Sequence, residues 1–400
     1  MNILHVVARM DPKLGGVAEA VKLITNGLVN SGIKNEVVSL DSPENVLSVQ
    51  GSFSLHPLGS GVSPWCYNSK LLPWLLTNLS RFDTVIIHGL WLYPSHAVRK
   101  VVQQLRDQGY NKSLRVFVMP HGMLDPYFQQ ASGRKLKAIR NWIYWKLIEK
   151  KVVNQADGLL FTCEEECKLA RETFSPYTPN RELIVGLGLE NIVPYTKNTK
   201  DAFEKVVPQL LDSSYILYLG RLDEKKGIDM LIESYQKLLT SKNLLMPNVS
   251  FPKLIIAGPG KETAYGKSLQ ALANSNPEYK DLIIFPGMLT GAAKWGALYG
   301  CDVFILPSHQ ENFGIVIVEA LACSKPVLIT NKVNIWREIE LEQSGIVVPD
   351  TRTGIYNLIT TWLALPENEK DKMRLNALKC FKKYFSLGPA SHRFLSAISV

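Results

Sequence analysis

The chain has 400 residues, with 46% hydrophobic residues, 20% charged residues and a formal net charge of +9 at pH 7. This length exceeds one ordinary hydrophobic core and predicts two domains of roughly 150–200 residues each, and the composition is typical of a soluble globular protein. The apolar runs all fall short of the ~20 residues that a membrane span needs. The positive charge favours anionic partners such as nucleotides, nucleic acid or an acidic membrane face, without choosing among them.

The N-terminal segment predicts a strand followed by a phosphate site. Residues 3–8 are apolar except for His5, and the segment lacks the basic leader and cleavage site of a signal peptide. Gly15 and Gly16 come next, before a predicted helix over residues 17–30. This arrangement would leave backbone N–H groups open to a phosphate or an oxyanion, and a plain tight turn is the alternative. The spacing is not Gly-x-Gly-x-x-Gly, which argues against a standard dinucleotide site.

Four further segments of the first half predict strands, at residues 37–40, 84–88, 115–119 and 157–161. Helical or looped segments separate them, as is typical of a doubly wound parallel sheet. His88 and His121 stand at the ends of two of these strands, where a side chain can reach a ligand-binding crevice. An ordinary packed or surface histidine is the alternative for each.

Residues 133–154 predict a basic amphipathic helix, with Trp142, Trp145 and Ile148 at helical spacing and Leu136 and Ile139 on the same face. Basic and aromatic residues together favour contact with a membrane surface or with a lipid-linked acceptor. The alternative is a core-facing helix with a solvated basic side.

Residues 184–198 contain glycine, proline and polar residues and predict the connection between the domains. A second series of predicted strands follows, at residues 215–219, 253–257, 282–285, 303–306, 327–330 and 346–348. The sequence therefore predicts two α/β domains, over residues 1–190 and 191–384.

The first strand of this second series leads into Gly220-Arg221, and Lys226-Gly227 follows five residues later. Arginine as a planar fork and lysine as a point charge can together hold a diphosphate. Ordinary basic residues in a charged turn are the alternative interpretation.

Two carboxylates follow the strand at 303–306, with Glu311 in a polar loop and Glu319 in the predicted helix after Gly314. Ionised carboxylates only accept hydrogen bonds and a sugar mostly offers hydroxyl donors, so this pair suits a sugar in one crevice. Gly314 would leave the first N–H groups of the helix open to phosphate. The alternative is a solvated loop charge and a surface residue of a first helical turn.

The segment 307–327, PSHQENFGIVIVEALACSKPV, resembles the donor-sugar motif of the family 4 retaining glycosyltransferases, and Gly220-Arg221 with Lys226-Gly227 resembles their phosphate clamp. The resemblance implies the GT-B fold, in which two Rossmann-like doubly wound domains face a central cleft. It implies acceptor binding by residues 1–190, donor binding by residues 191–384, and a final helix at about 385–400 that crosses back to the first domain. Ser324, where the family usually has glycine, and the segment 331–340 depart from the pattern and leave the exact donor open.

The resemblance also implies roles for single residues. His121, Arg221, Lys226 and Glu311 are the predicted catalytic residues, with His121 near the transferred sugar and Glu311 on the donor sugar. Glu319 is expected to bind the ribose hydroxyls. The predicted donor-binding residues are Gly15, Gly16, Arg221, Lys226, Met288, Glu311, Asn312, Phe313, Gly314, Ile315 and Glu319. No metal and no cofactor are expected, because the sequence has no Asp-x-Asp pair of the kind that holds a divalent ion.

The predicted activity is the transfer of a hexose, with glucose from UDP-glucose as the first candidate, to a saccharide or lipid-linked hydroxyl acceptor in bacterial polysaccharide or glycolipid synthesis. A nucleotide-sugar epimerase of the same fold and a basic nucleotide- or membrane-binding module without catalysis are the alternatives. The predicted location is the cytoplasm, with peripheral contact at the inner membrane face through residues 133–154. Nucleic acid is not an expected partner, and the six scattered cysteines fit reduced thiols.

Overall fold

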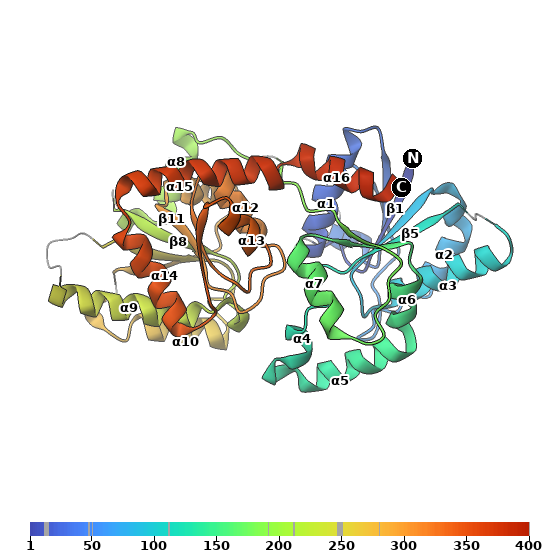
Figure 1. Cartoon of the computed structure of the whole chain (residues 1–400), viewed down its shortest axis with the longest axis horizontal. Coiled ribbons are helices and arrows are strands. Elements are labelled where there is room, and N and C mark those ends of the chain that lie inside the picture. Colours follow the sequence, from blue (N-terminus) through green and yellow to red (C-terminus); the bar gives the residue numbers. More distant parts are fainter. Residues whose placement is uncertain are drawn as a thin grey trace. The chain divides into compact units, whose positions relative to one another are not determined.

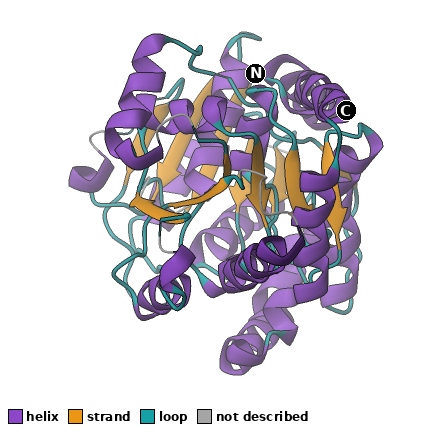
Figure 2. Ribbon diagram, turned by 90° about the vertical axis from the view of Figure 1, so that its left-hand side faces the viewer, coloured by secondary structure: helices purple, strands orange, loops and turns teal. Residues whose placement is uncertain are grey.

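The computed structural model describes residues 1–11, 16–46, 49, 51–110, 113–190, 192–210, 213–245, 251–279 and 281–399. The chain divides into two compact units (Figure 1). Unit 1 comprises Met1–Glu190 and Ser386–Val400, and unit 2 comprises Asn191–Phe385. In each unit the strands lie between helices (Figure 2), as the sequence predicts for an α/β protein.

Unit 1 is built on a parallel sheet whose described strands have the order β3-β2-β1-β4-β5-β6-β7. The strands are β1 (Asn2–Val7), β2 (Lys34–Ser39), β3 (Ser54–Pro57), β4 (Thr84–His88), β5 (Arg115–Met119), β6 (Gly158–Phe161) and β7 (Glu182–Ile184). β1 pairs with β2 on one side and with β4 on the other. The strand order therefore reverses between β1 and β4, and such a reversal is where open α/β sheets bind ligands.

The helices of unit 1 cover both faces of this sheet, so the residues of its central strands are almost all buried. They are α1 (Gly16–Val29), η2 (Pro43–Val46), α2 (Leu71–Asn78), η3 (Leu79–Arg81), α3 (Tyr93–Asp107), α4 (Tyr127–Gln130), η4 (Ser132–Arg134), α5 (Lys135–Tyr144), the π-helical η5 (Trp145–Glu149), α6 (Lys150–Gln155), α7 (Glu164–Thr173) and α16 (Leu387–Ser399). The C-terminal helix α16 packs on α1, where a Cβ at Gly27 would collide with the Ser391 side chain. Glycine therefore permits the close approach of these two helices.

Unit 2 has a second parallel sheet, with the described strands in the order β10-β9-β8-β11-β12-β13. The strands are β8 (Tyr215–Leu219), β9 (Lys253–Ala257), β10 (Ile283–Gly287), β11 (Val303–Leu306), β12 (Val327–Thr330) and β13 (Gly345–Val348). The order reverses between β8 and β11, which pair directly through Ile216 and Val303. Unit 2 thus has its own reversal point.

The helices of unit 2 flank this sheet in the same way. They are α8 (Lys197–Val206), η6 (Pro208–Leu210), η7 (Glu224–Lys226), α9 (Ile228–Leu245), α10 (Ala264–Ala273), η8 (Pro277–Tyr279), α11 (Gly291–Gly300), α12 (Ile315–Ala322), α13 (Trp336–Leu341), α14 (Arg352–Ala364), α15 (Glu367–Cys380) and the π-helical η9 (Phe381–Phe385). Helix α12 is buried along most of its length, in agreement with its almost wholly apolar sequence. Among the described helices, none is both long and apolar enough to cross a membrane.

The sequence predicted most strands because their residues form buried apolar runs, and six of them, such as β4 and β11, have the predicted bounds. The strands β3 and β7 were not predicted. Both lie at the edges of the first sheet, are only partly buried and are three or four residues long, so they lack a clear apolar pattern.

The helix predicted over residues 133–154 is present without a break from Lys135 to Gln155, as α5, the π-helical η5 and α6, and the turn η4 precedes it. The single apolar face predicted for this helix was wrong. Trp145 is fully buried, whereas Trp142 is 55% exposed, so these two tryptophans do not share a face. A π-helical turn contains an extra residue, and it therefore rotates the side chains that follow Tyr144 relative to those of α5.

Candidate active site

The charged residues predicted in unit 2 lie after two neighbouring strands. β8 leads into residues 220–227, and β11 leads into residues 307–314. Because these strands are paired and parallel, both loops leave the carboxyl edge of the sheet at the point where the strand order reverses. The fold therefore brings together two segments that are about 85 positions apart in the sequence, as for Lys226 and Glu311.

The backbone ties these two loops together. The Lys225 carbonyl accepts a hydrogen bond of 2.8 Å from the His309 N–H. Gly227 ends the η7 turn with φ of 63°, and a Cβ there would collide with the Pro307 carbonyl oxygen. Glycine is thus required where the turn that carries Lys226 packs against the start of the second loop.

Lys226 and Glu311 form an ion pair across the two loops, from the Lys226 ammonium to the Glu311 Oε2. Their side chains are only 10% and 20% exposed. Burial alone would raise the pKa of Glu311, but Lys226, with Lys225 and Arg221 nearby, lowers that pKa below its usual range. Arg221 is exposed in the same loop. Three cations thus lie near Glu311, and arginine and lysine together suit a diphosphate.

Helix α12 follows the second loop and carries Glu319. Gly314 precedes Ile315 with φ of 72°, a conformation that favours glycine. Glu319 is buried, and its Oε1 accepts a hydrogen bond of 2.5 Å from the Lys294 ammonium of α11. A buried carboxylate requires such a partner. The sequence analysis missed Lys294, because a contact between two helices leaves no local pattern.

The other predicted donor-binding residues have different surroundings. The Asn312 side-chain oxygen accepts a hydrogen bond of 3.2 Å from the Asn334 amide. Phe313 is buried, with its ring edge-on at 5.7 Å from the Phe385 ring. Met288 directly follows β10 and is exposed. Asn312 and Phe313 therefore support the loop 307–314, and the contact of these three residues with a donor stays a prediction.

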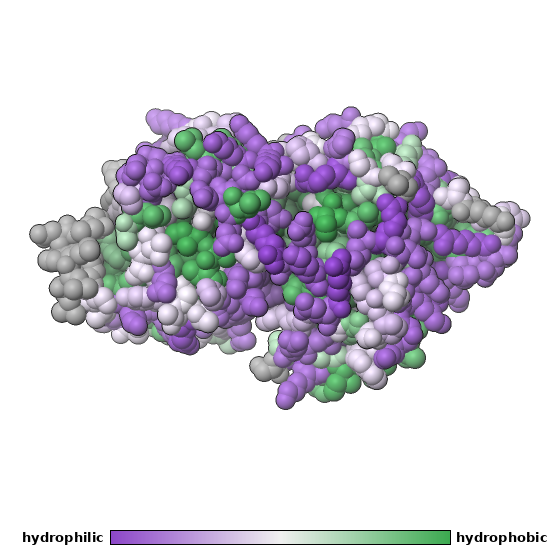
Figure 3. All heavy atoms as spheres, in the orientation of Figure 1, coloured by the Kyte–Doolittle hydropathy of each residue, from purple (hydrophilic) through white to green (hydrophobic). Residues whose placement is uncertain are grey.

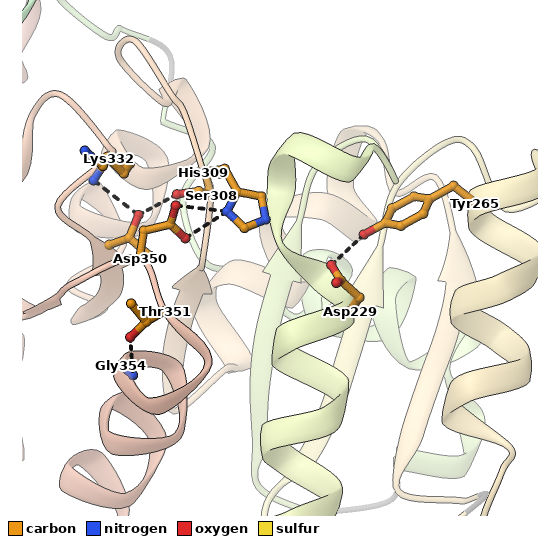
Figure 4. Close-up of polar contacts among 9 residues, drawn as sticks. Asp229, Tyr265, Ser308, His309, Lys332, Asp350, Thr351 and Gly354 are labelled. Atoms are coloured by element: carbon orange, nitrogen blue, oxygen red, sulfur yellow. Dashed lines mark hydrogen bonds and ion pairs between the residues drawn. The ribbon is translucent and has the colours of Figure 1, made fainter. Parts of the chain in front are cut away.

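A histidine–aspartate pair also holds the loop 307–314 (Figure 4). The His309 Nδ1 lies 2.8 Å and 2.9 Å from the two carboxylate oxygens of Asp350, and this hydrogen bond raises the pKa of His309. Figure 4 shows the neighbouring pair of Tyr265 and Asp229, in which the tyrosine hydroxyl donates at 2.9 Å. Through its backbone and its ring, His309 links the loop to Lys225 and to the end of β13. The sequence analysis did not identify this pair.

In unit 1, a cavity of about 190 Å³ lies at the carboxyl ends of β1 and β4. Gly16, the first residue of α1, lines it, whereas Gly15 lies outside the described residues. His88 also lines the cavity, but His121 is not among its lining residues. The apolar wall is interrupted by Arg9 and by other polar groups, including Ser95. The cavity thus occupies the reversal point of this unit.

Three histidines from three adjacent strands form a hydrogen-bonded row in unit 1. His5 lies in β1, His88 ends β4 and His121 follows β5. The His121 Nε2 lies 2.9 Å from the His88 Nδ1, and the His88 Nε2 lies 2.9 Å from the His5 Nδ1. The row ends where the His5 Nε2 meets the Asn35 Oδ1 at 3.2 Å. The sequence identified His88 and His121, but only the sheet brings His5 to them.

The Asn35 oxygen at the end of the row determines which nitrogen of each histidine carries the proton. Burial lowers the pKa of His5 and of His121 to about 4, and it lowers the pKa of His88 well below the usual value, so all three rings are neutral at pH 7. The Asn35 oxygen can only accept, so His5 donates from Nε2 and accepts at Nδ1. The same alternation continues through His88 and assigns the His121 proton to Nε2. The Nδ1 of His121 is then a hydrogen-bond acceptor.

Two buried glutamates hold the loops around this row. The Glu166 carboxylate accepts a hydrogen bond of 2.6 Å from the Gly122 N–H, beside His121, whose φ is 52°. The Glu149 carboxylate accepts from the Trp91 N–H at 2.8 Å and from the Ser95 hydroxyl at 2.6 Å. Burial raises the pKa of Glu149 to about 7. The sequence analysis identified neither glutamate, because both act through contacts distant in the chain.

The six cysteines are buried. In the described parts of the chain, no group of three or more histidine, cysteine, aspartate or glutamate residues is arranged to hold a metal ion. The predicted independence from metal stays a prediction.

Solved structures share the fold of this protein. Two Rossmann-like units, each with a parallel sheet, form the GT-B fold of glycosyltransferases, as the sequence predicted. The structure of HepE from Anabaena in complex with UDP has a TM-score of 0.75 to this chain, covers 100% of both chains and is 16% identical. A structure of the same Anabaena protein with UDP-glucose has a TM-score of 0.73. At such identities the likeness establishes the fold alone.

Sequence comparison then supports the class of this protein. Residues 199–379 match the family model of the glycosyl transferases group 1. An uncharacterised glycosyltransferase of Methanocaldococcus jannaschii is 26% identical over 385 residues, which cover 90% of each chain. A D-inositol 3-phosphate glycosyltransferase of Jonesia denitrificans is 26% identical over 211 residues, or 51% of this chain and 48% of that protein. The matched region, 181 of the 400 residues, is similar to the glycosyl transferases group 1, and these comparisons support a glycosyltransferase by class.

Proposed function

We propose that this protein is a retaining glycosyltransferase of the family 4 type, which transfers a hexose from a nucleotide diphosphate to a hydroxyl acceptor. UDP-glucose is the first candidate donor, and the Anabaena fold relative solved with UDP and with UDP-glucose supports it. The observation that carries the proposal is the pair of Lys226 and Glu311 beside Arg221, at the reversal point of the unit 2 sheet.

The chemical demand of the transfer is to stabilise negative charge on the departing diphosphate. Arg221 and Lys226 would supply fixed positive charge there, and preorganised groups of this kind are usually the largest catalytic contribution. In unit 1, the backbone N–H groups at the start of α1, at Gly16, are proposed to bind an anionic group, whereas Gly15, the other predicted glycine, lies outside the described residues.

The pair of Lys226 and Glu311 suggests how the donor enters. The diphosphate would replace Glu311 as the partner of Lys226, and the released carboxylate would accept hydrogen bonds from the sugar hydroxyls. Glu319 is proposed to accept hydrogen bonds from the ribose in the same way. Each carboxylate already has a lysine partner, Lys226 or Lys294, which keeps it ionised and in position.

His121 is proposed to accept a hydrogen bond from a hydroxyl of the transferred sugar, through the Nδ1 that the row of histidines leaves as an acceptor. No side chain is assigned as a nucleophile. The leaving phosphate itself would take the proton of the acceptor hydroxyl while the sugar is transferred on the same face, with retention. This mechanism requires no cofactor and no metal, so full activity in the presence of a chelator is expected, and complete loss on chelation would contradict it.

The acceptor is proposed to bind in unit 1, at the cavity beside Gly16 and His88. A saccharide or lipid-linked precursor of a bacterial polysaccharide or glycolipid is the proposed acceptor class. The cytoplasm is the proposed location.

The test is a panel of nucleotide sugars, screened by thermal denaturation, because a ligand that binds only the folded state raises the melting temperature. UDP-glucose is expected to raise it in the parent and in the surface control Lys267→Met, but not in Lys226→Met. An equal rise in Lys226→Met would refute the clamp. Conversion of the donor to another sugar nucleotide without any acceptor would instead identify an epimerase.

A further inference from the structure

Helix α5 and the following turn η5 expose an unusual number of large apolar side chains in unit 1. The exposed fractions are 84% for Leu136, 57% for Ile139, 55% for Trp142, 47% for Ile143 and 68% for Leu147. Leu136, Ile139 and Ile143 are separated by three and four positions, the spacing of one helical face, and Leu147 lies in the π-helical turn that follows. We call these five side chains the α5 patch. Figure 3 shows hydrophobic atoms beside hydrophilic ones where Figure 1 places α5.

The α5 patch is surrounded by positive charge. Between residues 126 and 156, the chain has seven basic residues and a single acidic one, Glu149, which is fully buried. The basic residues are Arg134, Lys135, Lys137, Arg140, Lys146, Lys150 and Lys151. The Lys146 ammonium lies 5.6 Å from the Trp142 ring centroid, so charge and apolar surface are interleaved. This segment therefore presents apolar and cationic groups together without an exposed carboxylate of its own.

The opposite side of the helix is already used by the core of unit 1. Tyr144 stacks on Trp65 at 4.6 Å, and the fully buried Trp145 stacks on Phe174 at 4.8 Å. The helix is thus fixed on the unit by these aromatic contacts. Fixing one side of the helix in this way keeps the α5 patch turned to solvent rather than to the protein interior.

We propose that the α5 patch docks unit 1 on the surface of an anionic lipid bilayer. A helix with apolar side chains in the centre and lysine and arginine at the sides suits the boundary between acyl chains and anionic head groups. The apolar side chains would enter the boundary region, and the basic side chains would contact the head-group phosphates. A neutral apolar protein surface would not pair with the basic side chains, and a polar acidic surface would not cover the apolar ones.

The docking also bears on the acceptor, a step that rests on the proposed function. The η5 turn ends at Glu149, whose carboxylate holds Ser95 at the wall of the unit 1 cavity. The α5 patch and the acceptor cavity therefore belong to one connected part of unit 1. A lipid-linked acceptor would be delivered from the bilayer on which the α5 patch is docked.

The test is co-sedimentation of the full chain with vesicles. Vesicles that contain phosphatidylglycerol are expected to bind the protein at least ~10-fold more tightly than vesicles of phosphatidylcholine alone, with binding weakened by salt. Equal binding to both, or binding to neither, would overturn the proposal. Self-association of the parent in buffer that is lost in the patch variant would also overturn it, because the occupant would then be a second copy of the chain.

Paired variants separate docking from folding. Leu136→Ser with Leu147→Ser should reduce binding to the anionic vesicles by at least ~10-fold, since two apolar side chains that would enter the bilayer are lost. The matched control is Leu341→Ser with Leu375→Ser, at exposed leucines of unit 2 with exposed fractions of 71% and 65%. This control should bind as the parent does. An equal reduction in both pairs would contradict docking through the α5 patch.

The charge is tested in the same way, with Lys137→Glu and Lys146→Glu against a control of Lys267→Glu and Lys372→Glu in unit 2. Only the first pair should abolish the preference for anionic vesicles. An equal loss in both pairs would show that net charge alone attracts the protein to the vesicles, and it would overturn docking through the α5 patch. The thermal response to UDP-glucose should be unchanged in all four variants. Its absence in the parent would refute the proposed function and leave the vesicle result independent of it.

Discussion

Replacing Glu311 by glutamine tests the clamp most directly. The change keeps the shape of the side chain and removes its charge. It leaves the Lys226 ammonium, whose side chain is 10% exposed, without its counter-charge and close to Arg221 and Lys225. Removing one partner of a buried ion pair costs more than the pair itself contributes, because the remaining charge stays desolvated.

The structure sets the magnitude of this effect. Breaking a buried pair costs ~3–5 kcal/mol, and the residual exposure of both side chains places Glu311→Gln at the lower end, about 3 kcal/mol. For a unit of this size, 1 kcal/mol shifts the melting temperature by ~2–4 °C. The melting temperature of unit 2 should therefore fall by ~6–12 °C.

The assay is thermal denaturation with and without UDP. The diphosphate of UDP can replace the missing charge, so UDP should raise the melting temperature of Glu311→Gln by more than that of the parent. The double variant Lys226→Met with Glu311→Gln removes both charges, and it should regain most of the stability while losing the response to UDP. A melting temperature of Glu311→Gln within ~2 °C of the parent would refute the reasoning, as would a smaller response to UDP.

Three further predictions concern single groups. Arg221→Ala should lower kcat/KM by ~10²–10³-fold with an unchanged melting temperature, because the side chain is exposed, and a steady-state rate within about threefold of the parent would contradict its role. Glu319→Gln should weaken the binding of UDP in calorimetry more than it slows the reaction, and an unchanged Kd would argue against the ribose contact. Below pH 6.5 His5 becomes protonated in the unfolded chain, whereas in the folded chain it stays neutral down to about pH 4. The free energy of unfolding should therefore decrease as the pH is lowered from 6.5 to 4. The slope is about 1.4 kcal/mol per pH unit for each such histidine, and urea denaturation that gives a flat profile for unit 1 would contradict the neutral row.

The local pattern of the sequence was sufficient to predict a strand where the strand is buried along its whole length. The strand β11 is a run of four apolar residues and was predicted at its observed bounds, because both faces of a parallel sheet are covered by helices. Gly227 and Gly314, which belong to the motifs that the sequence analysis singled out, both have positive φ at their turns. The basic and aromatic composition of residues 133–154 was evident, but not which tryptophan would be buried. That choice depended on the π-helical turn at Trp145 and on the aromatic rings packed behind it.

By itself, the sequence determined the fold class, the alternation of strands and helices in each half, and the motifs that lead to Arg221, Lys226, Glu311 and Glu319. It did not determine which of these groups meet. The pairing of Lys226 with Glu311 follows from β8 lying beside β11, and the row of histidines follows from β1, β4 and β5 being neighbours. Parallel strands that are apolar throughout are nearly interchangeable as local sequences. Their order is settled only when the helices, the connections and the buried polar partners are packed together, and the tertiary structure alone therefore decided the contacts of the site.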